Sequence, residues 1–234
     1  ACIIIEPVQG SNPRNDIVPF LIQLQTICKS NGILLIFDEI ITGFRLGIGG
    51  ATELWTLKPD IVTYGKIIGG GLPVGLVTCT DKVAFNSFNN PDKKIHTGGT
   101  FSGNPLVSET GTAVISELVK LDYSLINDFG ELLRNRLNLF FKESSLPFSA
   151  IGTGSINRLA FTDKKFRNRS ERDRLEMSYE IQTQFQLNML KQKVAWPTNG
   201  ILFTGFCNNK EQIEDFCTKI GFAAKNIIEN NTKF

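Results

Sequence analysis

Three side chains capable of acid–base chemistry stand at the ends of three short apolar runs in the sequence. Glu6, Asp38 and Lys66 each follow a stretch of β-branched and aliphatic residues. In open α/β sheets, ligands bind in the crevice beyond the carboxyl ends of the strands. Taken singly, Asp38 could cap the next segment and Lys66 could be a solvated cation. Together and in order, two carboxylates and an amine predict a chemical site at one sheet edge.

An amine and a carboxylate at neighbouring strand ends suit pyridoxal phosphate (PLP) chemistry. PLP is an electron sink when a lysine holds it and a carboxylate stays ionised beside its pyridine nitrogen. Asp38, at the end of a buried apolar strand, is placed to keep that nitrogen protonated. The glycines at 69–71 let the backbone come close to a cofactor.

The elements that would position these residues follow from hydrophobic periodicity. The pattern predicts a helix at 17–31 and strands at 3–5, 33–37, 61–64 and 74–79. A helix between the first two strands makes a crossover, so those strands should be parallel. Only residues 65–73 separate the last two strands, too few for a crossover, which predicts an antiparallel edge strand. The β-branched run at 3–5 is typical of a strand buried on both faces.

The second half of the chain has its own pattern of elements. We expect helices at 105–121, 124–141, 171–190 and 210–229, and strands at 156–161 and 201–206. Asn208 with Glu211 fits a capping box for the last helix. This organisation predicts two domains, at 1–121 and 122–234.

Composition excludes several classes of protein. The 234 residues carry 25 basic and 23 acidic side chains, so no basic field points to nucleic acid. No apolar run approaches the ~18 residues of a membrane helix. Five cysteines without a paired framework favour a reducing, cytoplasmic location, and the single histidine, His96, argues against a metal site. The sequence opens inside a strand without an initiator Met, which we interpret as a fragment lacking its N-terminal part.

Several motifs resemble class III aminotransferases. The similarity lies in Glu6-Pro7-Val8-Gln9-Gly10, Leu34 to Glu39, Thr42-Gly43-Phe44-Arg45, Pro59-Asp60-Ile61, Gly65 to Gly75, and Gly99 to Pro105. Their order and spacing are also similar, over most of residues 1–121. The resemblance implies the α/β fold type I of PLP-dependent transferases. It implies part of the large domain, with a mostly parallel sheet, followed by a small α+β C-terminal domain.

The resemblance also implies roles for individual residues. Lys66 would form a Schiff base with PLP and shuttle the α-proton, and Asp38 would pair with the pyridinium nitrogen. Ile40 would pack on one ring face. Gly99 and Thr100 would bind the cofactor, with Thr100 reaching the phosphate of a partner subunit. The implied partners are therefore a second copy, in a homodimer with composite sites, and a small amino or keto substrate.

The branch that looks most similar is glutamate-1-semialdehyde 2,1-aminomutase, together with the aminotransferase domains of polyketide and peptide synthases. Ile41 stands where many ω-aminotransferases carry Gln, as suits the aminomutase-like branch. No Arg occurs between 193 and 206, where relatives acting on ornithine-like substrates carry one. Glu6 is a weaker carry-over, with a substrate or structural role. The family's phosphate loop and ring-stacking aromatic would lie before residue 1.

Three alternatives stay open at this point. One is a class III transaminase that acts on a different amino donor and acceptor. Another is a P-loop ATPase, since an apolar strand ending in Asp38-Glu39 also fits a Walker B segment, although no G-x-x-x-x-G-K-[ST] loop occurs in these residues. The third is an inactive dimerisation module.

Overall fold

The computed structural model describes residues 1–89, 92, 95 and 98–231. The chain divides into two compact units. The first comprises Ala1–Val8 and Asp16–Tyr123, and the second comprises Gln9–Asn15 and the chain from Ser124 onward. The short segment Gln9–Asn15 thus leaves the first unit and joins the second. In the part of the chain that the structure describes, no helix has the length and apolar character needed to cross a bilayer.

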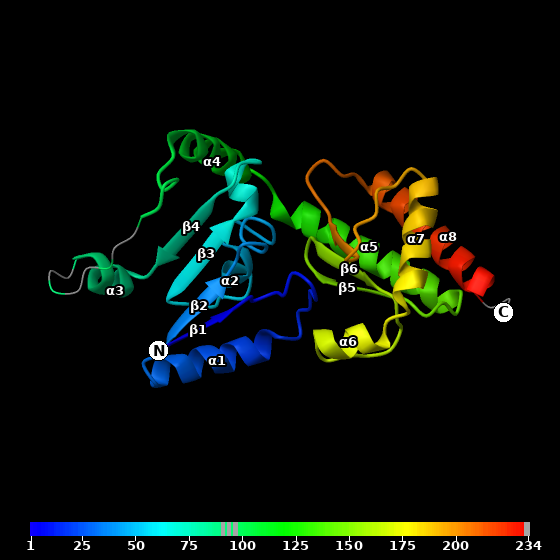
Figure 1. Cartoon of the computed structure of the whole chain (residues 1–234), viewed down its shortest axis with the longest axis horizontal. Helices are drawn as coiled ribbons and strands as arrows, with labels where there is room; N and C mark the ends of the chain where they lie inside the picture. Colours follow the sequence, from blue (N-terminus) through cyan, green and yellow to red (C-terminus); the bar gives the residue numbers. More distant parts are fainter. Residues whose placement is uncertain (90–91, 93–94, 96–97, 232–234) are drawn as a thin grey trace. The chain divides into compact units, whose positions relative to one another are not determined.

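A four-stranded sheet forms the centre of the first unit (Figure 1). Its order is β1 (Cys2–Ile5), β2 (Leu34–Asp38), β3 (Ile61–Gly65) and β4 (Gly75–Cys79). The first three strands are parallel, and β4 pairs antiparallel with β3. Both predictions about strand direction are therefore confirmed, because the short connection before β4 permits only a return in the opposite direction.

Helix α1 (Val18–Ser30) packs on the sheet through one apolar face. Leu21 and Cys28 are buried against Leu35 and Phe37 of β2, as the helical spacing predicts. The expectation that the first strand is buried on both faces is wrong. Ile4 of β1 is 63% exposed, since α1 covers the opposite face.

Short helical segments that the periodicity did not predict surround this sheet. They are α2 (Gly50–Leu54), a 3₁₀ turn (Lys66–Gly69), α3 (Asp81–Ala84) and a π-helical turn (Phe85–Asn89). Each is too short for an apolar repeat to be visible in the sequence. The predicted helix after the glycine-rich loop is present as α4 (Pro105–Leu118), with the Asn104 side chain accepting a hydrogen bond from Val107 N at 3.2 Å.

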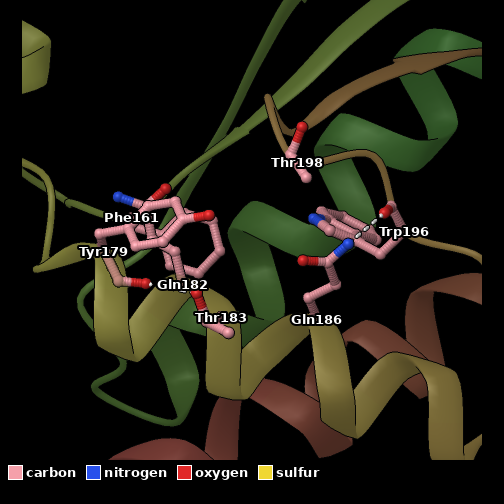
Figure 2. A pocket seen from close by; sticks show the side chains of 7 residues that line it. All are labelled: Phe161, Tyr179, Gln182, Thr183, Gln186, Trp196 and Thr198. Atoms are coloured by element: carbon pink, nitrogen blue, oxygen red, sulfur yellow. Dashed lines mark hydrogen bonds between the residues drawn. The ribbon is translucent and has the colours of Figure 1, made fainter.

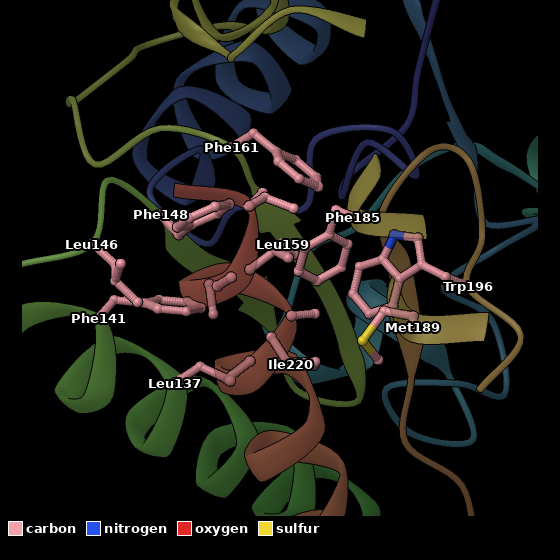
Figure 3. Packing of buried hydrophobic residues seen from close by; sticks show 14 of the residues in the cluster. Leu137, Phe141, Leu146, Phe148, Leu159, Phe161, Phe185, Met189, Trp196 and Ile220 are labelled. Carbon is pink, nitrogen blue, oxygen red and sulfur yellow. The ribbon is translucent and has the colours of Figure 1, made fainter. Parts of the chain in front are cut away.

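The second unit is an antiparallel sheet covered by long helices. The sheet order is β5 (Ser149–Thr153), β6 (Ile156–Ala160) and β7 (Ile201–Phe203). Helices α5 (Tyr123–Glu143), α7 (Tyr179–Lys191) and α8 (Lys210–Asn231) supply the apolar faces. Figure 3 shows the resulting aromatic core, in which Phe185 contacts the rings of Phe161 and Trp196 at centroid distances of 5.2 and 4.9 Å.

Two details of this unit differ from the prediction. The helix expected at 171–190 is two helices, α6 (Arg169–Leu175) and α7, because Glu176 is extended. Its carboxylate accepts two hydrogen bonds from Arg158 of β6, both at 3.1 Å. The capping box of α8 is also displaced by one residue: Asn209 Oδ1 accepts from Gln212 N at 2.9 Å, and Gln212 Oε1 accepts from Asn209 N at 3.1 Å.

Candidate active site

The parallel arrangement of β1, β2 and β3 brings the three predicted residues to one edge of the first sheet. Glu6 follows β1, Asp38 ends β2, and Lys66 follows β3. Because parallel strands end at the same edge, two carboxylates and an amine occupy neighbouring strand ends there. Glu6 is half-buried, whereas Lys66 is exposed.

Asp38 is held by two hydrogen bonds that use the same carboxylate oxygen. Its Oδ1 accepts from the backbone N–H of Ile40 at 3.1 Å and from the Thr63 hydroxyl at 3.3 Å. Thr63 is the register partner of Asp38 on β3, so both side chains stand on the same face of the sheet. Among the described residues, no hydrogen bond occupies Oδ2. The carboxylate is therefore oriented while one of its oxygens can accept a proton donor from a ligand.

Lys66 adopts a backbone conformation that is rare for a residue with a side chain. Its φ is +50°, in the left-handed region, where non-glycine residues are uncommon and strained. It opens the 3₁₀ turn immediately after β3. Within the described part of the chain, neither an ion pair nor a hydrogen bond holds its amine. Lys66 thus presents an exposed and unengaged amine directly after the carboxyl end of β3.

Ile40, two residues after the acid, lies against Gly65, the residue before the amine. A Cβ added to Gly65 would stand 3.6 and 3.7 Å from the branched carbons of Ile40. The side chain of Ile40 therefore covers the backbone directly before Lys66. It offers an apolar surface beside the Asp38 carboxylate, whose Oδ1 binds the Ile40 amide.

Gly99 and Thr100 lie in an exposed turn before α4. The Ser102 amide donates to Gly99 O at 2.9 Å, and both predicted residues are exposed. Among the residues that the structure describes, no hydrogen bond joins either of them to Asp38 or Lys66. Their predicted contact with a cofactor phosphate stays a prediction. His96 lies outside the described residues.

Two residues of this edge have a structural role that the sequence did not predict. Thr63 is a polar residue in an apolar strand, which could have indicated a partner, but its link to Asp38 requires the strand register. Glu39 is fully buried beside Asp38, whereas the sequence singled it out only as part of the Walker B alternative and of the family motif that ends at this residue. Burial raises the pKa of nearby Tyr64, and Glu39 and then Glu53 raise it further. Tyr64 therefore stays protonated at neutral pH, as a neutral ring at the end of β3.

A separate shallow pocket lies in the second unit (Figure 2). Aromatic rings of Phe161, Tyr179 and Trp196 and amides of Gln182 and Gln186 line it. Gln186 Nε2 donates to the backbone oxygen of Trp196 at 3.2 Å, and Gln182 Nε2 donates to that of Met177 at 2.9 Å. No carboxylate or amine lines this pocket, so the sheet edge of the first unit is the better candidate for acid–base chemistry.

Comparison with known proteins identifies relatives along nearly the whole chain. The profile of the family described as aminotransferase class-III matches residues 1–220. A glutamate-1-semialdehyde 2,1-aminomutase from Methanosphaera stadtmanae is 38% identical over 169 residues, covering 70% of this chain and 39% of the relative. One from Caldicellulosiruptor bescii is 35% identical over 224 residues, covering 92% of this chain and 51% of the relative. The chain thus spans about two-fifths to one-half of the length of these curated relatives.

Solved structures share the fold. An omega-transaminase from Sphaerobacter thermophilus superposes with a TM-score of 0.84 at 23% identity, over 97% of this chain and 52% of that one. A glutamate-1-semialdehyde-aminomutase from Pseudomonas aeruginosa PAO1 gives a TM-score of 0.82 at 21% identity, over 97% and 52%. These similarities confirm the fold class expected from the sequence. With the match of its sequence to the family profile, the chain belongs to the class III aminotransferase family.

Proposed function

We propose that the complete protein is a PLP-dependent enzyme that transfers amino groups, with Lys66 as the residue that holds the cofactor. The observation that carries this proposal is the position of Asp38 and Lys66 at the carboxyl ends of two neighbouring strands. Asp38 is oriented through Oδ1 alone, and the Lys66 amine leaves the next strand from a strained backbone. Membership in the class III family favours this interpretation of Asp38-Glu39 over nucleotide binding.

The residues at this edge fit the chemistry of PLP. PLP supplies an electron sink that stabilises negative charge on a substrate carbon. Asp38 would use its second oxygen to keep the ring nitrogen protonated. Ile40 would pack on the ring, since its side chain already covers Gly65. The Lys66 amine, once displaced by substrate, would accept and return the proton at the substrate α-carbon.

For the reaction we propose an isomerisation like that of glutamate-1-semialdehyde 2,1-aminomutase, in which the amino group moves between adjacent carbons of one substrate. Relatives of that name at 35% and 38% identity support it, as does Ile41 in place of Gln. The second candidate is a transaminase with a different amino donor and acceptor, favoured by the similarity of the fold to omega-transaminases. We further propose an active homodimer in which Gly99 and Thr100 bind the cofactor, with Thr100 at the phosphate of the partner's cofactor. Glu6 has a substrate or a structural role in this proposal. The five free cysteines support a cytoplasmic location.

The cofactor assignment is tested by reduction and peptide mapping. The complete protein is incubated with PLP and borohydride, and the phosphopyridoxyl group is located by mass spectrometry. We expect the label on Lys66, its loss in Lys66→Arg, and its retention in the control Lys120→Arg, whose side chain is an exposed cation in the turn after α4. A label on another lysine of the wild-type protein contradicts the assignment.

The choice between the two reactions needs a separate assay. The complete protein is supplied with glutamate-1-semialdehyde, with and without an added amino donor. Turnover without a donor is the expected result for an isomerisation. A strict requirement for a second amino compound would instead show a transaminase.

A further inference from the structure

Glu39 is a buried carboxylate that the proposed chemistry does not use. Its side chain is fully buried and receives four hydrogen bonds. The Thr42 hydroxyl donates to Oε2 at 2.6 Å and the Ala51 amide donates to Oε2 at 2.8 Å. The Thr52 amide donates to Oε1 at 2.7 Å, and the Thr52 hydroxyl donates to the same oxygen. Both oxygens therefore act as acceptors only, and no acceptor capacity is left for a ligand in the usual geometry.

The chain folds closely around this carboxylate. Gly50 has a φ of +64°, and a Cβ on it would lie 2.0 Å from Glu39 Oε2. A Cβ on Gly43 would lie 2.4 Å from the Tyr64 ring and 2.8 Å from the backbone oxygen of Glu39. The loop at 40–50 thus closes on the Glu39 side chain on one side and on the end of β3 on the other.

Glu39 occupies the peptide unit between the two residues that face the proposed cofactor. Its amide donates to Thr63 O at 3.0 Å, which extends the β2–β3 ladder by one residue. Asp38 precedes it, and Ile40 follows it with its amide bound to Asp38 Oδ1. Because successive side chains of extended backbone point to opposite faces, Glu39 anchors this unit from the face away from Asp38.

We propose that Glu39 is a positioning residue for the cofactor site, which sets the orientation of Asp38 and Ile40 by anchoring the loop that follows them. This inference rests on the proposed PLP function of the first unit. Glu39 touches neither cofactor nor substrate. Its carboxylate accepts one donor from the loop at Thr42 and three from the start of α2 at Ala51 and Thr52, and so fixes both ends of the loop. The loop in turn holds the backbone from which the acid and the ring-packing side chain project.

The variant Glu39→Gln tests the proposal with little change in volume. Its amide group places a donor where the loop already presents donors, so part of the anchor is lost. The matched control is Glu53→Gln, the same chemical change at a carboxylate of α2. Glu53 is exposed, and its carboxylate accepts from the Gly49 amide at 2.7 Å. A second pair, Thr42→Val and Thr42→Ser, removes or keeps one donor to Glu39.

The measurements are made on the complete protein and include two that do not depend on turnover. PLP affinity is measured by titration, and the visible circular dichroism of the bound cofactor reports the orientation of its ring. We expect roughly tenfold weaker PLP binding and an altered dichroism band in Glu39→Gln, because the anchoring bonds end on a charged group. Glu53→Gln should match the wild type, and Thr42→Ser should be closer to it than Thr42→Val. Hydrogen exchange without PLP should be faster at Ala51 and Thr52 in Glu39→Gln.

The outcomes separate this inference from the proposed function. If the wild-type protein binds PLP and Glu39→Gln binds it with the same affinity and the same dichroism, the positioning role is wrong while the function stands. A lower unfolding temperature with an unchanged dichroism band would likewise reduce Glu39 to a structural residue and overturn the inference. If the wild-type protein binds no PLP, the proposed function fails first and the cofactor role of Glu39 fails with it.

Discussion

The buried charge cluster of the second unit allows a quantitative prediction about stability. Glu176 and Arg158 each have side chains only 6% exposed, and Glu176 accepts both bonds from Arg158 at 3.1 Å. Arg172, 3% exposed, lies 3.6 Å from the same carboxylate. Burial lowers the pKa of Arg158, while Glu176 opposes that shift. Removing the carboxylate in Glu176→Gln therefore leaves two buried guanidinium groups without their shared counter-charge.

The expected cost of Glu176→Gln is about 3–5 kcal/mol of unfolding free energy, the range for breaking a buried ion pair. The control is Asp215→Asn, which breaks a more exposed ion pair. In that pair the side chain of Asp215 is 59% exposed and that of Lys219 is 33% exposed. It should cost less than about 1 kcal/mol. Urea unfolding is followed by the fluorescence of Trp196, which lies in the second unit, after any other tryptophan has been replaced by phenylalanine.

A double replacement separates lost charge pairing from lost packing. Arg158→Met with Glu176→Leu removes one charge of each sign and keeps apolar volume, while Arg172 retains its ion pair with Asp173. The double replacement should therefore recover part of the stability lost in Glu176→Gln. If Glu176→Gln costs no more than Asp215→Asn, the reasoning that this cluster is desolvated and interdependent is refuted.

Two further predictions concern packing and thiol chemistry. Gly130→Ala places a Cβ 2.0 Å from the backbone oxygen of Gly154 and should cost about 3 kcal/mol, whereas Gly75→Ala meets no atom within 4 Å and should change the free energy by about 0.5 kcal/mol in urea unfolding. Equal costs would contradict the packing argument. Burial raises the pKa of Cys217 to about 12 from 9.0, so its thiol should resist iodoacetamide at mildly alkaline pH while exposed Cys207 reacts, as peptide mapping would show. Because the folded pKa is raised, the stability that Cys217 contributes below pH 9 should be lost as pH rises toward 12; rapid alkylation of Cys217 in the folded protein would contradict both statements.

The strand ends of the first unit were predictable because their signals are local. Each of the mainly apolar strands before Asp38 and Lys66 is a single contiguous segment of sequence, and the short connection before β4 leaves one possible direction. The anchor of Asp38 was not predictable. The hydroxyl of Thr63 reaches it across 25 positions of sequence, and that pairing depends on a register that periodicity does not contain.

One of the two errors in the second unit has the same origin. Residues 171–190 carry an uninterrupted helical pattern, but Arg158 lies 18 positions before Glu176 and draws its carboxylate out of the helix. The N-cap of α8 was mispredicted for a different reason. Asn208 with Glu211 and Asn209 with Gln212 have the same spacing, and the structure uses the second pair. There Asn208 Oδ1 accepts from the Gly205 amide at 2.8 Å instead, within the preceding turn.

Asp38 and Glu39 show how neighbouring carboxylates acquire different roles. Both follow the same apolar strand, and their side-chain chemistry is nearly identical. Asp38 receives two hydrogen bonds on one oxygen and stays partly exposed. Glu39 receives four hydrogen bonds, two on each oxygen, and is fully buried. A carboxylate with an open oxygen can change its partner during a reaction, but a saturated buried one would leave four donors unsatisfied if it moved. The number of hydrogen-bond donors that the fold supplies therefore leaves Asp38 able to bind a ligand and makes Glu39 an anchor for the loop.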